Sequence, residues 1–205
     1  MQTVVLPTDH THALPAALKM LTEGGLVAFP TDTVYGLGAR IDLPLSIERL
    51  YQAKDRETTK SIAVLLGDVS QLELLTDGFN AMAMRLAERF WPGPLTLVIP
   101  RNPALPDVLS SNATVGVRMP DHPFALTLLR QSGPLATTSA NRSGRAKAVS
   151  AGEALEYLCG RVELILDGGK TPGGVPSTVV DCTGAEPVIL REGPIQAADL
   201  AVVLS

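Results

Sequence analysis

The sequence LVAFPTDTVYGLG, residues 26–38, joins a compact apolar run to a stretch of small and hydroxyl-bearing residues. The run Leu26–Phe29, closed by Pro30, predicts a short buried strand. Ligands of α/β sheets bind beyond the ends of strands, which is where the hydroxyl groups and backbone amides that follow would lie. Gly36 and Gly38 would let the backbone approach a ligand closely. The alternative is a glycine-rich turn in which the Thr and Asp side chains bond their own backbone.

Strand-like apolar runs alternate with helix-like patterns outward from this stretch, and strands become more frequent toward the C-terminus. This order predicts an α/β (α+β) fold, with one twisted sheet of mixed parallel and antiparallel strands and flanking helices. No interdomain linker is visible, so residues 1–205 are interpreted as a single domain. The predicted strands are residues 3–6, 26–29, 62–66, 95–99, 115–117, 135–138, 164–166, 178–180 and 188–190. The predicted helices are residues 14–21, 46–53, 82–90, 121–129, 150–160 and 197–204, with a further one capped by Asp68.

The composition is that of an ordinary globular chain. Of the 205 residues, 45% are hydrophobic and 19% are charged, and the formal net charge is −4. A protein that binds nucleic acid non-specifically is usually strongly basic, so any RNA contact would need a local patch. The two cysteines, Cys159 and Cys182, are expected to be reduced thiols. The N-terminal residues MQTVVLPTDH have no basic segment before an apolar run, so they are not expected to be a signal peptide. No apolar run approaches the ~18 residues of a membrane span, so we expect a cytoplasmic protein.

A cationic segment follows one of the predicted helices. Lys54, Arg56 and Lys60 place three cations within seven residues. Such groups supply the donors and the charge that bind a triphosphate. Asp55 and Glu57 nearly cancel this charge, so a solvated surface is the alternative interpretation.

Polar side chains follow further predicted strands. Arg118 ends the apolar strand of TVGVRMP, residues 114–120, where it lies on a rim or faces an anion. The segment ATTSANRSG, residues 136–144, carries five hydroxyl or amide side chains, and a capped loop is the alternative. The segments PSTVVD, residues 176–181, and LREG, residues 190–193, are each typical of an ordinary strand edge.

Two other patterns fail as motifs. GKT at residues 169–171 would need a glycine at position 164 to form a phosphate-binding loop, and that residue is Leu164. The histidines have no metal-ligand spacing, so no metal site is predicted and surface or capping roles are expected for His10, His12 and His122.

Together, these segments resemble the YrdC-like family, which includes threonylcarbamoyl-AMP synthases. FPTDTVYGLG, the KxR element, VGVRMP, SANxSG, STVVD and LREG occur in that family's order from position 29 to position 193. The resemblance implies a twisted mixed sheet, similar to the DHBP synthase-like fold, around a concave, positively lined cavity. It implies that threonine is held by Thr33, Arg118, Thr138 and Ser177. It implies that ATP is surrounded by Lys54, Arg56, Lys60, Thr114, Ser139, Asn141, Ser143 and Arg191, with Lys54 and Arg56 as the catalytic pair.

The implied reaction forms threonylcarbamoyl-adenylate and pyrophosphate from L-threonine, bicarbonate or CO2, and ATP, with Mg2+ accompanying the ATP. The product would pass to a tRNA threonylcarbamoyl transferase complex, and contact with tRNA or double-stranded RNA is also expected. No membrane partner is implied. The chain ends soon after LREG, so it is expected to lack the additional C-terminal domain of longer relatives.

Two departures and two alternatives accompany the resemblance. The family commonly has proline where this chain has Glu57 and Ser61, and these changes affect loop shape and the exact ATP contacts. One alternative is a nucleotide- or RNA-binding module of the same fold without turnover. The other is a carbamoyl-adenylate enzyme with a substrate other than threonine.

Overall fold

The computed structural model describes residues 1–204, in which the apolar run and the glycines after it form an antiparallel strand pair. The predicted strand is confirmed as β2 (Val27–Phe29), whereas its partner β3 (Gly36–Arg40) was expected to be a turn or loop. A Cβ atom on Gly36 would lie 3.0 Å from Thr137 Cγ2. A Cβ atom on Gly38 would lie 2.9 Å from a ring carbon of Phe29. The two glycines are therefore strand residues, because the missing side chains let β3 fit against its neighbours.

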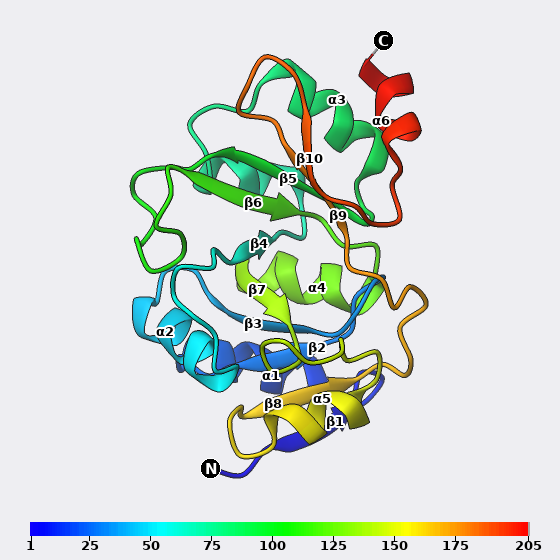
Figure 1. The fold of residues 1–205 in the computed structure, drawn as a ribbon. Coiled ribbons are helices and arrows are strands. Elements are labelled where there is room, and N and C mark those ends of the chain that lie inside the picture. The colour runs from blue at the N-terminus through cyan, green and yellow to red at the C-terminus, as the bar shows by residue number, and fades with distance from the viewer. Residues whose placement is uncertain (205) are drawn as a thin grey trace.

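The strands of the described residues form one ten-stranded sheet in the order β1-β8-β2-β3-β7-β4-β6-β5-β9-β10 (Figure 1). The β1–β8, β2–β8, β4–β6 and β5–β9 pairs are parallel, and the other neighbours are antiparallel. The predicted mixed sheet is thus confirmed. The remaining strands are β1 (Val4–Pro7), β4 (Ala63–Leu65), β5 (Leu95–Pro100), β6 (Thr114–Arg118), β7 (Leu135–Ser139), β8 (Leu164–Asp167), β9 (Thr178–Asp181) and β10 (Val188–Arg191).

The helices begin where the sequence signals predicted, within a few residues. His122 Nδ1 accepts a hydrogen bond from the backbone amide of Ala125, so the expected capping role of this histidine is confirmed. Ser150 caps the next helix by accepting from the amide of Glu153. The helix predicted at Asp68 is a 3-10 helix, η1 (Val69–Leu74). The α-helices are α1 (Ala13–Thr22), α2 (Pro44–Ala53), α3 (Ala81–Phe90), α4 (Pro123–Ser132), α5 (Ala151–Leu158) and α6 (Ala197–Leu204).

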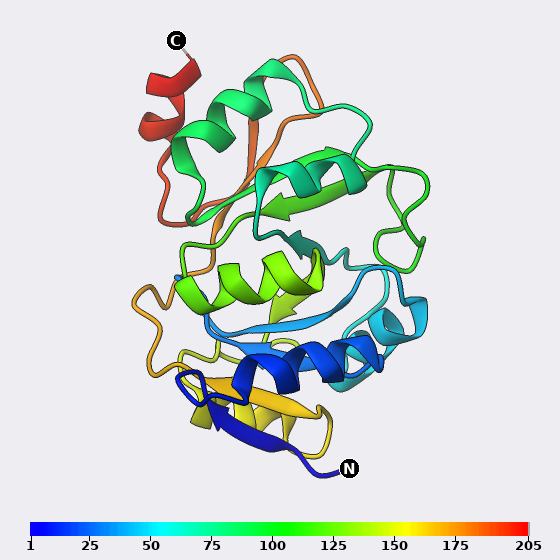
Figure 2. The ribbon, with the colours of Figure 1, turned by 180° about the vertical axis from the view of Figure 1, so that it is seen from behind.

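Two hydrophobic clusters join the helices to the sheet. Helices α1 and α4 lie side by side (Figure 2) and share a cluster with Val27, Phe29 and Leu135. Helices α2, α3, α5 and α6 contribute to a larger cluster. Alternation along a strand sends successive side chains to opposite faces. In β5 and β6, one set of alternate residues packs into the larger cluster: Leu95, Leu97, Ile99, Val115 and Val117. The residues between them point to the opposite face of the sheet, where they line a cavity.

Both cysteines are free thiols, with Cys159 exposed and Cys182 buried. Within residues 1–204, no helix has the length and apolar character needed to cross a membrane.

Candidate functional site

A cavity of about 310 Å3 lies over the middle strands of the sheet. This volume is at the lower end of the range typical of small-molecule sites. From β5 and β6 it receives the second set of alternate residues, Thr96, Val98, Gly116 and Arg118. The rest of the lining comes from the β2–β3 loop, from β3, β4, β7, β9 and β10, from the residues directly before β4 and β9, and from Arg56 and Lys147 on loops.

The cavity brings together seven of the twelve side chains that the sequence singled out. The seven are Thr33, Arg56, Arg118, Thr138, Ser139, Ser177 and Arg191. All four residues that the resemblance relates to threonine are among them. The five that do not line the cavity are Lys54, Lys60, Thr114, Asn141 and Ser143.

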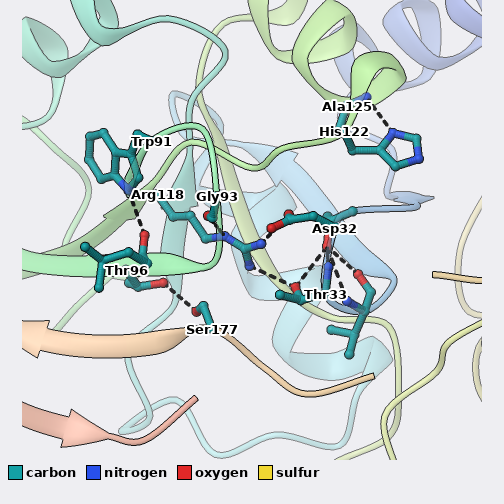
Figure 3. A network of polar contacts seen from close by, with 12 residues as sticks. Asp32, Thr33, Trp91, Gly93, Thr96, Arg118, His122, Ala125 and Ser177 are labelled. Atoms are coloured by element: carbon teal, nitrogen blue, oxygen red, sulfur yellow. Dashed lines mark hydrogen bonds and ion pairs between the residues drawn. The ribbon is translucent and has the colours of Figure 1, made fainter. Parts of the chain in front are cut away.

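Arg118 is held at the cavity wall by three partners (Figure 3). Its Nε donates to the carbonyl of Gly93 across 2.9 Å, and one terminal nitrogen donates to Thr33 Oγ1 across 3.0 Å. The other terminal nitrogen forms an ion pair with Asp32. The side chains of Arg118 and Asp32 are only 7% and 13% exposed. Burial lowers the pKa of Arg118 from its ordinary value, and the adjacent Asp32 opposes that shift. The carboxylate thus compensates this cation before any ligand binds.

Ser177 is fixed from two sides. Its hydroxyl lies 2.7 Å from Thr96 Oγ1, and both groups are buried. Arg191 donates to the Ser177 carbonyl across 3.0 and 2.8 Å and to the Ser177 hydroxyl across 3.1 Å. The STVVD and LREG segments, far from the first motif in sequence, therefore meet at one wall of the cavity. Figure 3 shows Thr96 and Ser177 facing each other across neighbouring strands.

Lys54 is buried beneath the residues that line the cavity, where its hydrogen bonds join two loops. The residue is 2% exposed. Its ammonium group donates to the backbone carbonyls of Ser139 and Asn141, and its own carbonyl accepts from the amide of Ser143 across 3.0 Å. Burial, then the neighbouring cations Lys147 and Arg56, lower the pKa of Lys54 to about 7. Its side chain can act on a ligand by shaping the loop at residues 139–143.

The other residues outside the lining have local partners. Lys60 forms an ion pair with Glu57 across 3.2 Å on the surface. The buried Asn141 donates to the carbonyls of Arg142 and Arg145, and its side-chain oxygen is one of two buried side-chain atoms without a hydrogen-bond partner among the described residues. Ser143 is exposed. Thr114 begins β6.

Lys147 and Tyr35 line the cavity although the sequence did not single them out. Lys147 Nζ lies 3.3 Å from Ser139 Oγ. Tyr35 donates its hydroxyl to the carbonyl of Gly169 across 2.7 Å and accepts from the amide of Gly168 across 3.2 Å. Burial raises the pKa of Tyr35 to about 12, so the phenol stays protonated. Tyr35 belongs to FPTDTVYGLG but was given no role of its own, whereas Lys147 lies outside every motif of the sequence.

The cavity is strongly cationic in a chain whose net charge is −4. Its lining within residues 1–204 includes three arginines and one lysine and no carboxylate: Arg56, Arg118, Lys147 and Arg191. In the same part of the chain, no group of three or more His, Cys, Asp or Glu side chains is arranged to hold a metal ion. The charge of the lining therefore matches an anionic ligand.

Fold and site together define an α/β protein with an open mixed sheet and a cationic ligand-binding cavity. The chain belongs to the Sua5, YciO and YrdC family, whose model, described as "Telomere recombination", matches residues 19–193.

Curated relatives and solved structures agree with this placement. The threonylcarbamoyl-AMP synthase of Bacillus subtilis (strain 168) is 45% identical over 191 residues, which cover 92% of this chain and 55% of that protein. A protein of the same name from Pyrococcus abyssi (strain GE5 / Orsay) is 43% identical over 190 residues, covering 92% and 56%. The chain thus spans about half the length of these relatives. A crystal structure of P. abyssi Sua5 complexed with L-threonine has a TM-score of 0.95 and 40% identity, covering 98% of this chain and 61% of that one.

Proposed function

We propose that the protein is a threonylcarbamoyl-AMP synthase, which forms threonylcarbamoyl-adenylate and pyrophosphate from L-threonine, bicarbonate or CO2, and ATP. The observation that carries the proposal is the single cationic cavity that collects Thr33, Arg118, Thr138 and Ser177 together with Arg56, Ser139 and Arg191. The name shared by the B. subtilis and P. abyssi relatives and the threonine bound in the P. abyssi structure support the same reaction.

The chemistry needs no covalent intermediate with the enzyme. The α-amine of threonine attacks CO2 and loses a proton, which gives a carbamate. A carbamate oxygen then attacks the α-phosphorus of ATP, the bond from that phosphorus to the bridging oxygen breaks, and pyrophosphate leaves. Two anions must meet in this step, so fixed cations that offset their repulsion lower the barrier. Holding the reactants in one cavity contributes several kcal/mol more.

The side chains divide by their charge and their partners. Arg118 is compensated by Asp32 and bonded to Thr33, so with Thr138 and Ser177 it is assigned to threonine. Arg56 and Arg191 have no carboxylate partner among the described residues and are assigned to the phosphates of ATP, with Arg56 as a catalytic residue.

The loop at residues 139–143 contributes to ATP binding through the way Lys54 holds it in place. Lys54 is a positioning residue that fixes Ser139, Asn141 and the adjoining Ser143. Lys60 and Thr114 lie outside the lining and receive no role in this scheme.

Magnesium would enter with ATP. Mg2+ is usually bound through substrate phosphates, waters and one or two carboxylates. The lining residues offer hydroxyl groups but no carboxylate, so they do not form a protein-built magnesium site. The roles assigned to the protein side chains above therefore do not depend on the ion.

The product is a labile mixed anhydride, so a second protein must consume it by transferring the threonylcarbamoyl group. A tRNA threonylcarbamoyl transferase complex fits this role. Direct contact of this protein with tRNA or double-stranded RNA would shorten the path that the labile product travels. The free thiols Cys159 and Cys182 support a reducing compartment, and we place the reaction in the cytoplasm.

The test is pyrophosphate release by the purified chain with ATP, magnesium and bicarbonate, with and without L-threonine. Release that requires threonine, and that L-serine and L-valine support poorly, is expected. An Arg56→Ala variant should lose most of the activity. Release with another amino acid in place of threonine would favour the alternative substrate. ATP binding without release would favour a binding module, and full activity of Arg56→Ala would remove the phosphate assignment.

A further inference from the structure

Positive charge in the cavity is compensated unevenly. Arg118 is paired with Asp32, whereas within residues 1–204 no acidic side chain forms an ion pair with Arg56, Lys147 or Arg191. In the described part of the chain, Arg56 donates to the backbone carbonyls of Lys60 and Ser61, and Arg191 donates to Ser177.

Lys147 lies among these uncompensated cations. It lines the same cavity as Arg56 and Arg191. Burial, then the charges of Arg191 and Arg56, lower the pKa of Lys147 from the ordinary value of a lysine. The Lys147 ammonium donates a hydrogen bond to the Ser139 hydroxyl across 3.3 Å. Like charges gathered without a counter-ion are unfavourable until an anion occupies the space between them.

The size of the uncompensated charge indicates which anion fits. A carboxylate carries one negative charge, which a single arginine satisfies, whereas a triphosphate carries about four and can accept from several donors at once. Lysine suits such a ligand, because its ammonium is a compact charge with three donors on a flexible stem. Lys147 is exposed on its loop, so the stem can follow the ligand.

We propose that Lys147 is a direct contact for the polyphosphate chain of the nucleotide, completing with Arg56 and Arg191 a cluster of three cations. This inference rests on the proposed function for the identity of the nucleotide, but not for the polyphosphate contact itself. Lys147 thereby becomes a ligand-binding residue that the motifs of the sequence do not include.

The experiment measures binding of inorganic tripolyphosphate to the full chain by titration calorimetry, at two salt concentrations. Four proteins are compared: the natural chain, Lys147→Met, Lys147→Arg and the matched control Lys170→Met. Lys170 is an exposed lysine on a neighbouring loop and does not line the cavity.

Loss of one charge-assisted hydrogen bond should weaken binding by about tenfold in Lys147→Met. Lys147→Arg should retain most of the affinity, and Lys170→Met should bind like the natural chain. Weaker salt dependence in Lys147→Met alone is also expected.

Unchanged tripolyphosphate affinity in Lys147→Met overturns the inference. Equal weakening in Lys170→Met also overturns it, because the effect would then report overall charge. Pyrophosphate release separates the two claims. If the natural chain shows no threonine-dependent release but Lys147→Met still binds tripolyphosphate tenfold more weakly, the proposed function fails and the inference stands. If release occurs and Lys147→Met keeps its KM for ATP and its tripolyphosphate affinity, the inference alone fails.

Discussion

The backbone amide of Ser143 donates a hydrogen bond of 3.0 Å to the carbonyl oxygen of Lys54. The same lysine donates its ammonium protons to the carbonyls of Ser139 and Asn141. Two segments separated by more than eighty positions are thereby joined into one unit behind the cavity. The lysine that the resemblance relates to ATP thus holds the loop that carries Ser139.

Replacing Lys54 with methionine should loosen that loop. The substitution keeps the apolar stem but leaves two carbonyls without their donor, so peptides covering residues 139–143 should exchange amide hydrogens about tenfold faster. Pyrophosphate release should fall at the same time. Hydrogen exchange followed by mass spectrometry measures the first effect, with Lys19→Met on the exposed face of α1 as the control. Lost activity with unchanged exchange in this loop would instead assign Lys54 a direct contact with the ligand.

The stability of the protein should rise with pH because of Lys54. Its pKa is about 7 in the folded chain and near its ordinary 10.5 when unfolded, so between these values the unfolded state binds more protons. The free energy of unfolding therefore increases with pH across this window, by about 1 kcal/mol per unit. Urea unfolding from pH 6 to pH 9 measures it. The increase should be smaller in Lys54→Met, and parallel curves for the two proteins would contradict the assignment.

Asp32 should contribute far more to the free energy of unfolding than Asp107, an exposed residue that pairs with Arg101. Asp32→Asn leaves the buried Arg118 without its counter-ion, which should lower the free energy of unfolding by about 3 kcal/mol. Asp107 pairs with Arg101 across 2.8 Å but is 93% exposed, so Asp107→Asn should change stability by less than about 0.5 kcal/mol. Urea denaturation compares the two variants. Equal effects would show that the ion pair at the cavity wall is as weakly coupled as one on the surface.

The contact between Thr96 and Ser177 should set the affinity for threonine. Thr96→Val keeps the shape of the side chain but removes the hydroxyl 2.7 Å from Ser177, and a lost hydrogen bond of about 1 kcal/mol should raise the KM for threonine about fivefold. The KM for ATP should not change. Steady-state kinetics test this, with Thr96→Ser as the variant that retains the hydroxyl. Parallel increases in both KM values would place Ser177 outside a threonine subsite.

The sequence predicted nine of the ten strands of the described chain, and the strand that it missed is β3 (Gly36–Arg40). A strand is recognised in a sequence by the alternation of its apolar side chains, and Gly36 and Gly38 have no side chains to contribute to that pattern. They are glycines because Thr137 and Phe29 occupy the space where a Cβ would lie. That requirement comes from neighbouring strands, so residues 36–40 resemble a turn when considered alone.

The sequence predicted those residues of the site that lie next to the ends of predicted strands. Thr33 follows a predicted strand, Arg118 ends one and Ser177 directly precedes one, and all three line the cavity. Direction was not predictable for the loops: nothing local distinguishes Lys54, which points into the protein, from Arg56, which lines the cavity. Lys147 stands between two alanines, and only the folded chain brings it beside Ser139.

The neighbouring strands β5 and β9 supply adjoining parts of the cavity lining, although about eighty residues separate them along the chain. Thr178, at the start of β9, pairs with Leu95 in β5. During synthesis the hydroxyl of Thr96 therefore leaves the ribosome long before Ser177 can meet it. A nascent chain that already contains FPTDTVYGLG, KxR and VGVRMP still lacks one wall of the cavity. A chain that lacks β9 and β10 is therefore expected to bind the ligand poorly, so the ligand can stabilise the fold only after these two strands have joined the sheet.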